Sequence, residues 1–377
     1  MSGLTAKLAL TASGIALVLL AGCGMPGTIA SANRLPTAPP QGTPAPLPPV
    51  MFPQDEAPHR DLTEWWYYTG HLHGKDPRGE SHAYGFELTV FQTLRGPFPP
   101  YYAAHYAISD LSRGQFQYDQ RVQFGADASV PAAGSQNGFN LGVGGWTMQG
   151  LNGHDHLSAA MSGYAIDLHL VGTKPAVLHG ASGIITLGQE GISYYYSRPV
   201  MSISGSLDDH GVAVTVAGTA WMDHQWGNFV SLAGLGWDWF SIQLDDNTEY
   251  MLYVIRDEQK RAVSVVGTYV GPDGTAHQLD ASDIITQATG TWTSSVTHGQ
   301  YPSGWSVRIT SQQVALTLTP ALADQELVTT QSTGVAYWEG TVQIVGTAGT
   351  TKVAGEGYVE LTGYAAVPSA TQTPSVP

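Results

Sequence analysis

Cysteine and positive charge are both scarce in this sequence. Its 377 residues include one cysteine, Cys23, which excludes disulfide bonds within the chain. Lysine and arginine total 15 against 30 aspartates and glutamates, so the formal net charge is −15. Phosphate binding needs clustered cations, and nucleic acid is therefore excluded as an expected partner. The acidic excess suits the solubility of an exported protein.

Helical periodicity and several catalytic signatures are also missing. No segment has the 3.6-residue period of a helix of three or more turns. There is no Gly-x-Ser-x-Gly elbow and no glycine-rich phosphate loop between a strand and a helix. His71 with His73, and His154 with His156, have a spacing that can hold a metal, but no third ligand follows at a telling distance. We therefore expect neither a metal nor a cofactor.

The N-terminus has the pattern of an export signal, residues 1–22. Lys7 precedes an apolar run, residues 8–20, that is too short for a stable membrane span. The run ends in LAGC (20–23), which resembles a bacterial lipobox with Cys23 as the lipidated first residue. An ordinary signal peptide with a chance cysteine is the alternative. The lipobox predicts an exported chain, anchored by lipid in the cell membrane or outer membrane and facing the periplasm or exterior.

Low-complexity stretches border the part of the chain that is expected to fold. Residues 23–58 are rich in proline and predict an extended tether. Residues 366–377 predict a disordered tail. Between them we expect two domains, 59–231 and 232–365, with the boundary at about residues 228–236.

Alternating residues indicate that both domains are β structure. In residues 64–72, Trp65, Tyr67, Thr69 and His71 fall on one face of a strand, and Glu64, Trp66, Tyr68 and Leu72 on the other. Similar runs recur at 82–92, 164–171, 192–199, 212–222, 237–244, 249–256 and 263–279, with hairpin turns at 245–247 and 272–274. Many antiparallel strands with two partly apolar faces are typical of closed barrels or sandwiches.

One stretch, TAWMDHQWG (219–227), places two titratable groups between indoles. Asp223 and His224 point to opposite faces if the strand continues through them, and His224 then shares a face with Trp226. A carboxylate near an imidazole can orient it and set its basicity. The structural alternative is a turn at the strand end, capped by Asp223, with an inert His224.

Asp238 is a second candidate, on the strand that follows the predicted boundary. It shares a face with Phe240, Ile242 and Leu244, and such surroundings raise a carboxyl pKa and favour a proton donor near pH 7. The alternative is an ionised Asp238 that accepts backbone hydrogen bonds. An acid in a dry aromatic cavity could protonate an alkene, because π-faces stabilise the resulting cation. Further candidates for lining such a cavity are Trp65, Tyr67, Glu87, His105, Trp221, Trp226, Trp237, Trp239 and Tyr250.

Seven blocks in the order expected of one family carry a resemblance that spans residues 59–365. They are EWWYYTGHL (64–72), HAYGFELTVF (82–91), HYAISDLSRGQF (105–116), SYYYSRPVMSISGSL (193–207), GTAWMDHQWG (218–227), WDWFSIQLDDNTEYMLYVIRD (237–257) and GYVELTGY (357–364). The chain resembles the AttH/CrtC superfamily, which includes carotenoid 1,2-hydratases, kievitone-hydratase-like fungal proteins, fungal pericyclases and exported proteins described as predicted secreted hydrolases.

The resemblance implies two consecutive lipocalin-like antiparallel β-barrels with a pocket between and within them. It implies that His224 and Trp226 correspond to the His-x-Trp of the hydratases, a site associated with acid–base hydration of an isoprenoid double bond. The Tyr-x-Asp of those enzymes has no match here, since EYMLYVIRD offers only Tyr250 and Tyr253. Either Asp238 replaces that acid or the carotenoid chemistry is absent.

Two classes of function follow from the residues and the resemblance together. The first is a hydro-lyase-like enzyme that hydrates, cyclises or isomerises a large hydrophobic, isoprenoid or lipid-like substrate with Asp223, His224 and Asp238. The second is a carrier lipoprotein that binds a hydrophobic small molecule without turnover. A secreted hydrolase of unknown substrate is a weaker alternative, because no nucleophile is evident.

Overall fold

The structure is a computed structural model that describes residues 47–125, 138–180, 182–187, 191–229 and 236–366. The chain divides into a unit of residues 1–48, of which only residues 47 and 48 are described, and a unit of residues 49–377. Cys23, the predicted signal, most of the tether and residues 367–377 of the tail lie outside the described residues. Among the described residues, no helix has both the length and the apolar character needed to cross a membrane.

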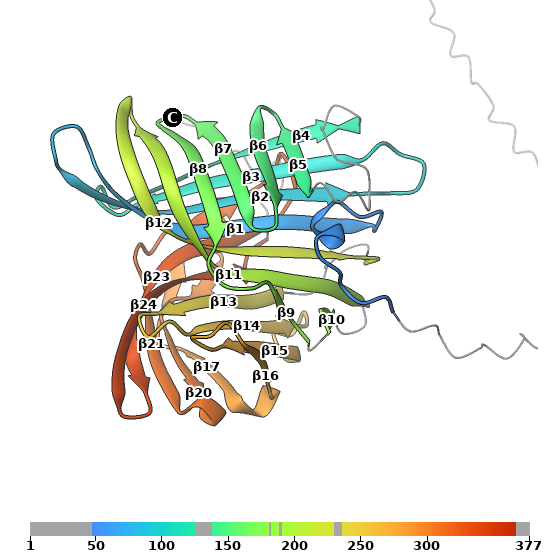
Figure 1. Ribbon diagram of the computed structural model, residues 1–377, viewed down its shortest axis with the longest axis vertical. Helices are drawn as coiled ribbons and strands as arrows, with labels where there is room; N and C mark the ends of the chain where they lie inside the picture. The colour runs from blue at the N-terminus through green and yellow to red at the C-terminus, as the bar shows by residue number, and fades with distance from the viewer. Residues whose placement is uncertain (1–46, 126–137, 181, 188–190, 230–235, 367–377) are drawn as a thin grey trace, which may run out of the picture. The chain divides into compact units, whose positions relative to one another are not determined.

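The first sheet is antiparallel and runs in the order β4-β3-β2-β1-β12-β11-β8-β7-β6-β5, with β9 and β10 paired to β11 (Figure 1). Its strands are β1 (Thr63–Lys75), β2 (Ser81–Thr93), β3 (Tyr101–Asp110), β4 (Gln115–Phe124), β5 (Phe139–Val143), β6 (Trp146–Leu151), β7 (His154–Met161), β8 (Tyr164–Gly172), β9 (Val177–Leu178), β10 (Ile184–Thr186), β11 (Ile192–Asp209) and β12 (Val212–Gly227).

The second sheet is also antiparallel, in the order β16-β15-β14-β13-β24-β23-β21-β20-β17, with β22 paired to β23. Its strands are β13 (Gly236–Leu244), β14 (Glu249–Arg256), β15 (Ala262–Val270), β16 (Ala276–Leu279), β17 (Ile284–Ala288), β20 (Trp305–Ile309), β21 (Val314–Pro320), β22 (Glu326–Val328), β23 (Ala336–Ala348) and β24 (Thr351–Thr362). A separate ribbon joins β18 (Thr291–Thr293) to β19 (Gln300–Pro302), and the helical turns are η1 (Gln54–Glu56), η4 (Ala281–Asp283) and η5 (Thr310–Gln312).

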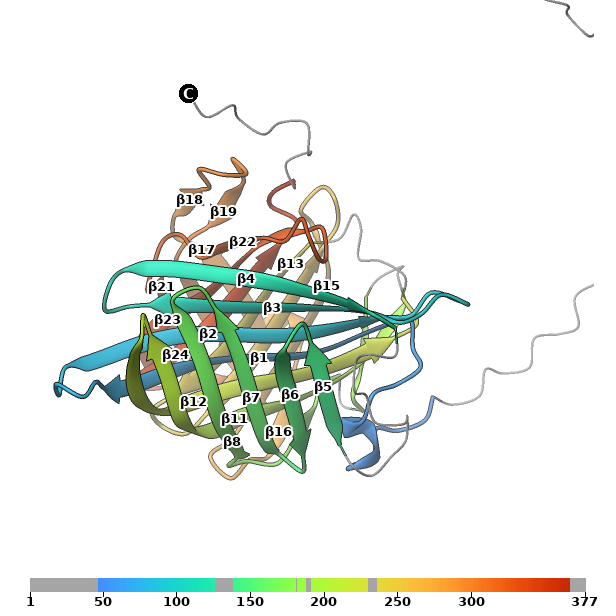
Figure 2. The same ribbon diagram turned by 90° about the horizontal axis from the view of Figure 1, so that it is seen from above.

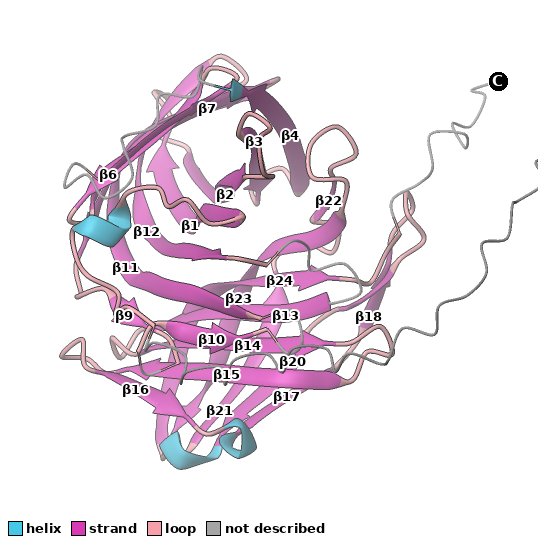
Figure 3. Cartoon of the chain, turned by 90° about the vertical axis from the view of Figure 1, so that its right-hand side faces the viewer, coloured by secondary structure: helices cyan, strands magenta, loops and turns pink. Residues whose placement is uncertain are grey.

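Both sheets curl into nearly closed barrels, which confirms the all-β prediction and the two lipocalin-like barrels (Figure 3). The predicted hairpin turns are present, at residues 245–248 between β13 and β14 and at 271–275 between β15 and β16. β12 ends at Gly227 and β13 begins at Gly236, but residues 230–235 of the predicted boundary lie outside the described residues. The predicted boundary between the two domains therefore stays a prediction.

Strand alternation gives each barrel a filled interior and leaves a third apolar layer between the barrels. Trp66, Tyr68 and the other inward residues of the first barrel form one core, and Phe240, Ile242 and their neighbours fill the second barrel. The outward faces of β1, β11 and β12 meet those of β13, β14 and β24 in a layer that contains Tyr67 and Trp239. Figure 1 shows β11 of the first sheet next to β13 of the second, and in Figure 2 the strands of the second sheet lie behind those of the first. The functional candidates concentrate in this layer between the barrels.

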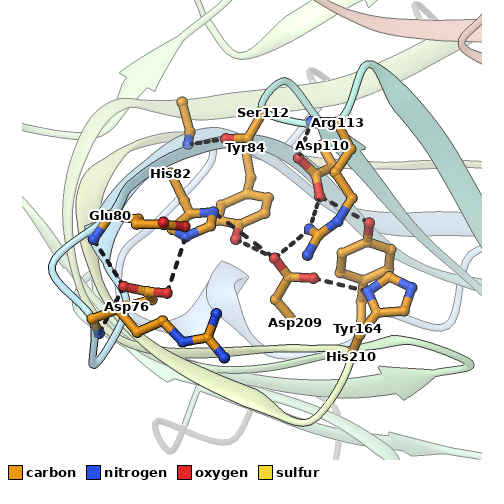
Figure 4. A network of polar contacts seen from close by, with 12 residues as sticks. Asp76, Glu80, His82, Tyr84, Asp110, Ser112, Arg113, Tyr164, Asp209 and His210 are labelled. Atoms are coloured by element: carbon orange, nitrogen blue, oxygen red, sulfur yellow. Dashed lines mark hydrogen bonds and ion pairs between the residues drawn. The ribbon is translucent and has the colours of Figure 1, made fainter.

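A polar network closes one end of the first barrel (Figure 4). The buried Asp209 carboxylate accepts hydrogen bonds from the Tyr84 hydroxyl at 2.8 Å and from Arg113 Nη1 at 2.5 Å. Asp110 accepts from Arg113 at 2.6 Å and from the Tyr164 hydroxyl at 3.0 Å. These bonds satisfy charges that would otherwise be costly to bury. The network therefore stabilises this end of the first barrel.

The last residues of the predicted tether pack on the folded unit. Glu56 in η1 is buried and forms an ion pair with Arg198 on β11, and its other carboxylate oxygen accepts the Asn152 N–H at 2.7 Å. Asp55 lies beside His59, with 3.3 Å between Oδ1 and the ring Nε2. Residues from about 49 onward therefore belong to the folded part of the chain.

Candidate active site between the two barrels

Two rows of side chains face each other across the layer between the barrels. In the first barrel, strand pairing places Asp223 of β12 opposite Tyr67 of β1, and Tyr67 opposite Thr89 of β2. In the second barrel, Trp239 of β13 pairs with Tyr253 of β14 on one side and with Glu360 of β24 on the other. Because side chains alternate along each strand, residues two positions from these extend the same two surfaces.

A cavity of about 60 Å³ lies between these rows. Its wall contains aromatic rings, three carboxyl groups and two other polar side chains: Trp65, Tyr67, Glu87, Thr89, Phe91, Asp223, Gln225, Trp237, Trp239, Tyr253, Tyr337 and Glu360. Trp65, Phe91 and Trp237 are only partly buried, so the cavity opens toward solvent past these three rings. Its volume suits the end of an apolar molecule, not a whole drug-sized ligand, for which pockets of about 300–1,000 Å³ are typical.

The surroundings raise the pKa of all three carboxyl groups in the wall to about 7 or 8. Burial raises the pKa of Asp223 to about 7 and that of Glu87 to about 7. Burial and the nearby Glu87 and Asp223 raise the pKa of Glu360 to about 8. Glu339, just behind the wall, has its pKa raised well above the usual range by burial and by Glu87 and Glu360. Carboxyl groups with such pKa values can give or accept protons at neutral pH.

Asp223 is held by three donors from the first barrel. Its Oδ2 accepts the Tyr195 hydroxyl at 2.6 Å, and its Oδ1 accepts the Trp221 indole N–H at 2.6 Å and the Ser197 hydroxyl. The Trp239 indole N–H donates to the Tyr195 hydroxyl at 2.9 Å and links this network to the second barrel. The three donors favour ionised Asp223 and partly offset the effect of its burial on the pKa.

Glu87 has one engaged oxygen and one unengaged oxygen. Its Oε1 accepts the Tyr337 hydroxyl of the second barrel at 3.0 Å and the Thr89 hydroxyl at 2.9 Å. Its buried Oε2 has no hydrogen-bond partner among the described residues. An unpaired carboxylate oxygen is costly to bury, which favours the protonated acid. Glu87, predicted only as a wall residue, therefore has the features of a proton donor.

His224 lies on the opposite face of β12 from Asp223, inside the first barrel. Its Nε2 is 2.7 Å from Glu64 Oε1, its Nδ1 is 3.2 Å from the Tyr196 hydroxyl, and its ring stacks on Trp66. β12 continues to Gly227, so Asp223 and His224 are within a strand and not in a capped turn. The prediction that Asp223 orients or balances His224 is wrong, because Glu64 takes that place.

Asp238 is also separated from the cavity. Its carboxylate pairs with Arg256, 2.9 Å from Nη2, and accepts the Tyr364 hydroxyl at 2.9 Å. Burial still raises the Asp238 pKa, as the sequence predicted. However, Asp238 points away from the face of β13 that carries Trp237 and Trp239, and Arg256 compensates its charge. The structure therefore does not bring Asp238 together with Asp223 and His224.

Some of the predicted wall residues line the cavity, and others lie behind it or inside the barrels. Trp65, Tyr67, Glu87, Trp237 and Trp239 line the cavity. Trp221 and His105 lie one layer behind it, since Trp221 donates to Asp223 and His105 Nδ1 is 2.7 Å from the Tyr337 hydroxyl. Trp226 and Tyr250 are inside the two barrels and do not reach the cavity.

Trp226 is already covered by an aromatic neighbour. The ring of His59 stacks on it at 4.0 Å with an interplanar angle of 3°. Trp226 therefore has a ring already stacked on it and lies inside the first barrel. It cannot stabilise a substrate cation in the cavity, contrary to the prediction from the sequence.

Several wall residues were not among the predicted candidates, although alternation places them beside predicted ones. Thr89 and Phe91 follow Glu87 on β2, Gln225 follows Asp223 on β12, and Tyr253 pairs with Trp239. Tyr337 and Glu360 come from β23 and β24, and only the packing of one barrel on the other brings them to this wall.

Possible metal ligands gather elsewhere among the described residues. The ligand-type atoms of His59, Glu64 and His224 lie within 4.8 Å of one another. However, Glu64 Oε1 is already 2.8 Å from His59 Nδ1 and 2.7 Å from His224 Nε2. Hydrogen bonds account for this group, so we assign no metal to it. The similar sets around Asp167 and Asp76 are at partly exposed positions and receive no assignment either.

Comparison with known proteins agrees with this architecture. The model of the AttH-like family matches residues 43–364, and the chain belongs to this family. A putative AttH from Nitrosomonas europaea, known from its crystal structure, is 30% identical, with a TM-score of 0.73 over 85% of this chain and 98% of that chain. No curated protein matches the sequence.

More distant structures share the fold alone. Kievitone hydratase from Nectria haematococca is 20% identical, with a TM-score of 0.66 over 85% of this chain and 94% of that chain. A protein named CghA is 11% identical, with a TM-score of 0.54 over 81% of this chain and 89% of that chain. The family and fold that the sequence motifs predicted are thus confirmed.

Proposed function

We propose that this protein is an acid–base catalyst that hydrates, cyclises or isomerises a double bond at one end of a large hydrophobic, isoprenoid or lipid-like substrate. The observation that carries the proposal is the cavity between the barrels, where Glu87 and Asp223 share an aromatic wall and burial raises the pKa of each to about 7. The hydratase named among the structures of the same fold supports hydration as the first reaction to test.

In this mechanism Glu87 is the general acid and Asp223 the general base. Glu87 protonates the alkene through Oε2, and the carbocation forms between Trp65, Tyr67 and Trp239, whose π-faces stabilise positive charge. A water molecule attacks the cation and gives its proton to Asp223. Without water, loss of a different proton completes an isomerisation, and attack by a second double bond leads to a ring.

The size of the cavity limits how the substrate lies. A volume of about 60 Å³ accepts a terminal group, while the rest of the chain would leave past the partly exposed Trp65 and Trp237. Burying apolar ligand surface there contributes about 25 cal/mol per Å². The same cavity could hold the end of a lipid without reaction, so a carrier is the second candidate.

The exported, lipid-anchored state predicted from LAGC (20–23) fits such a substrate. A chain tethered through Cys23 would meet lipid-like molecules at the membrane surface, reached over the proline-rich segment. We propose the anchor as part of the same function.

The test is turnover of acyclic isoprenoids with a terminal double bond in water labelled with oxygen-18. A hydratase yields an alcohol that carries the label, detected by mass spectrometry, and an isomerase or cyclase yields a product of unchanged mass with a new retention time. Quenching of tryptophan fluorescence by the same compounds, with no product, would identify a carrier and contradict catalysis.

A further inference from the structure

A chain of hydrogen bonds leads from Asp223 away from the cavity. The Ser197 hydroxyl donates to Asp223 Oδ1 and lies 2.7 Å from His179 Nε2. His179 Nδ1 lies 2.8 Å from the Thr268 hydroxyl of the second barrel. That hydroxyl is 3.3 Å from Oε1 of Gln278, which is exposed to solvent.

A second chain leads from Glu87 in another direction. The Tyr337 hydroxyl donates to Glu87 Oε1 and lies 2.7 Å from His105 Nδ1. His105 Nε2 is 2.9 Å from the Ser332 hydroxyl, which donates to Gln120 Oε1 at 2.7 Å. Ser332 and Gln120 are both partly exposed.

The two chains have the same order of chemical groups. Each runs from a carboxyl group in the cavity wall through a hydroxyl, a histidine and a second hydroxyl to a glutamine carbonyl nearer the surface. His105 and His179 are both 0% exposed, and both use their two ring nitrogens within the chain. Burial lowers the pKa of each histidine to about 3, so both stay neutral at ordinary pH. A neutral imidazole with two partners can pass a proton by exchanging tautomers.

We propose that these chains are two proton relays, one that returns a proton to Glu87 through His105 and one that removes a proton from Asp223 through His179. This inference rests on the proposed function, because hydration uses one proton from the acid and releases one to the base. The positions of the two histidines behind the wall lead the two carboxyl groups toward different parts of the surface, where Ser332 is partly exposed and Gln278 is exposed next to the buried Thr268.

The proton balance follows from the rule that a hydroxyl donates to one acceptor at a time. With ionised Asp223, Ser197 donates to Asp223, His179 Nε2–H donates to Ser197, and Thr268 donates to His179 Nδ1. With protonated Asp223, each bond is reversed: Asp223 donates to Ser197, Ser197 to Nε2, and Nδ1–H to Thr268, which donates to Gln278. The step between the two states breaks and forms one O–H or N–H bond at each group. The Gln278 carbonyl only accepts a hydrogen bond, and Thr268 is 0% exposed, so the proton passes between Thr268 and a water molecule that takes the place of the exposed Gln278 side chain.

The hydrogen-bond chain from Glu87 reaches His105 at Nδ1, whereas the one from Asp223 reaches His179 at Nε2. The two histidines therefore take opposite tautomers. With Glu87 protonated on Oε1, that hydrogen is donated to Tyr337, Tyr337 donates to His105 Nδ1, and Nε2 carries the hydrogen. A half-turn of the Glu87 carboxyl group then brings the acid hydrogen to the cavity side, where Oε2 lies. With ionised Glu87, Nδ1–H donates to Tyr337, and Nε2 accepts from Ser332. The two histidines should therefore switch tautomer in opposite directions as their carboxyl groups titrate.

The groups that surround each relay permit this switch without charging a histidine. His179 packs against the neutral Tyr195 ring at 4.2 Å, and His105 packs against Phe91 and the Tyr337 ring. The titratable groups next to the two acids include Tyr195, whose pKa is raised by burial and by Asp223, and Tyr337, whose pKa is raised by burial and by Glu87, together with Glu339 and Glu360. Each of these is neutral or largely protonated at pH 7.

The test is nuclear magnetic resonance of the full chain labelled with nitrogen-15 in histidine, from pH 5 to pH 9, without substrate. As pH rises through about 7, His179 should change from the Nδ1–H to the Nε2–H tautomer, and His105 from Nε2–H to Nδ1–H. Asp223→Asn should abolish the change at His179 alone, and Glu87→Gln the change at His105 alone. Fixed tautomers, a doubly protonated ring, or loss of both changes in one variant would overturn the relays.

Turnover gives an independent measurement on conservative variants. Ser332→Ala and Thr268→Val interrupt one relay each, and each should lower kcat roughly tenfold or more with little change in KM, because proton transfer contributes about 10²–10⁴ in rate. Ser202→Ala, at an exposed hydroxyl outside both chains, is the matched control and should keep wild-type kcat. Unchanged kcat in both relay variants would also overturn the proposal. Absence of turnover in the wild type would count against the proposed function and leave the tautomer test intact.

Discussion

His224 on β12 and Glu64 on β1 are 160 positions apart in sequence, yet His224 Nε2 lies 2.7 Å from Glu64 Oε1 inside the first barrel. Glu64 also receives His59 Nδ1 at 2.8 Å and the Gln92 side-chain amide at 2.9 Å. This buried carboxylate therefore joins the end of β1 to β2 and β12 and to the segment before β1. The His-x-Trp motif belongs to this group and not to the cavity wall, which predicts a role in stability.

The stability of this group should depend on pH. Burial lowers the pKa of His224 to about 4, and the bonds from His224 and His59 lower the Glu64 pKa despite its burial. Both groups contribute stability that is complete above their unfolded pKa values and is lost as pH falls through the folded values. We expect the free energy of unfolding to drop by up to about 3 kcal/mol between pH 7 and pH 4 through His224. Urea denaturation of the wild type and His224→Gln measures this, with His169→Gln as an exposed control. An equal acid loss in His224→Gln would contradict the assignment.

Glu87→Gln should lower turnover and raise stability at alkaline pH. The raised Glu87 pKa means that its stabilising contribution is complete below the unfolded pKa and is lost as pH rises through about 7. At pH 8 the wild type therefore holds a buried charge that Gln lacks, and we expect Glu87→Gln to be up to about 3 kcal/mol more stable there, with little difference at pH 4. Turnover should fall about 10²–10⁴-fold. A variant with wild-type turnover would remove Glu87 from the role of acid.

Asp223→Asn and Asp238→Asn should distinguish the role of the cavity from that of the interior of the second barrel. Asp223→Asn removes the base and should lower kcat at least about 100-fold with little change in ligand affinity. Asp238→Asn breaks the pair with Arg256 and should cost about 1–3 kcal/mol of stability while turnover is kept. Activity, ligand affinity and melting temperature on the same three proteins distinguish the cases. Loss of turnover in folded Asp238→Asn would restore the role predicted from the sequence.

The lipid anchor is open to direct measurement. Cys23→Ser should abolish labelling by a fatty-acid probe during expression in a bacterial host and should move the chain from the membrane to the soluble exported fraction. Equal labelling of both proteins would contradict the anchor. Turnover by the purified variant should match the wild type in detergent, because Cys23 precedes the folded unit.

The sequence predicted the faces of individual strands because a period of two is a local property. Trp65 and Tyr67 share a strand face as predicted, as do Trp237 and Trp239, and all four line the cavity. The same rule could not tell which face points into a barrel and which points between barrels. The apolar neighbours of Asp238 on its strand face predicted a proton donor, but that face is the filled interior of the second barrel.

Contacts between residues on distant strands could not be predicted from the sequence, for a different reason. Tyr337 reaches Glu87 across 250 positions, and His179 reaches Thr268 across 89. Neither pair follows from local periodicity, because each depends on how one curved sheet packs on the other. His105 was recognised as a candidate, but its place behind Tyr337 makes it a link in a chain and not a wall residue.

The acid and base roles predict how turnover depends on pH. Catalysis requires protonated Glu87 and ionised Asp223, and the pKa of each lies at about 7. The plot of kcat/KM against pH should therefore be bell-shaped, with a narrow maximum near pH 7 and a tenfold fall per pH unit on each side. Asp223→Glu keeps a carboxylate and should shift the acidic limb, whereas the alkaline limb set by Glu87 should stay in place. Rates that are flat between pH 5 and pH 9 would show that chemistry does not use this pair. Limbs that move together in Asp223→Glu would indicate that the two carboxyl groups titrate as one coupled unit.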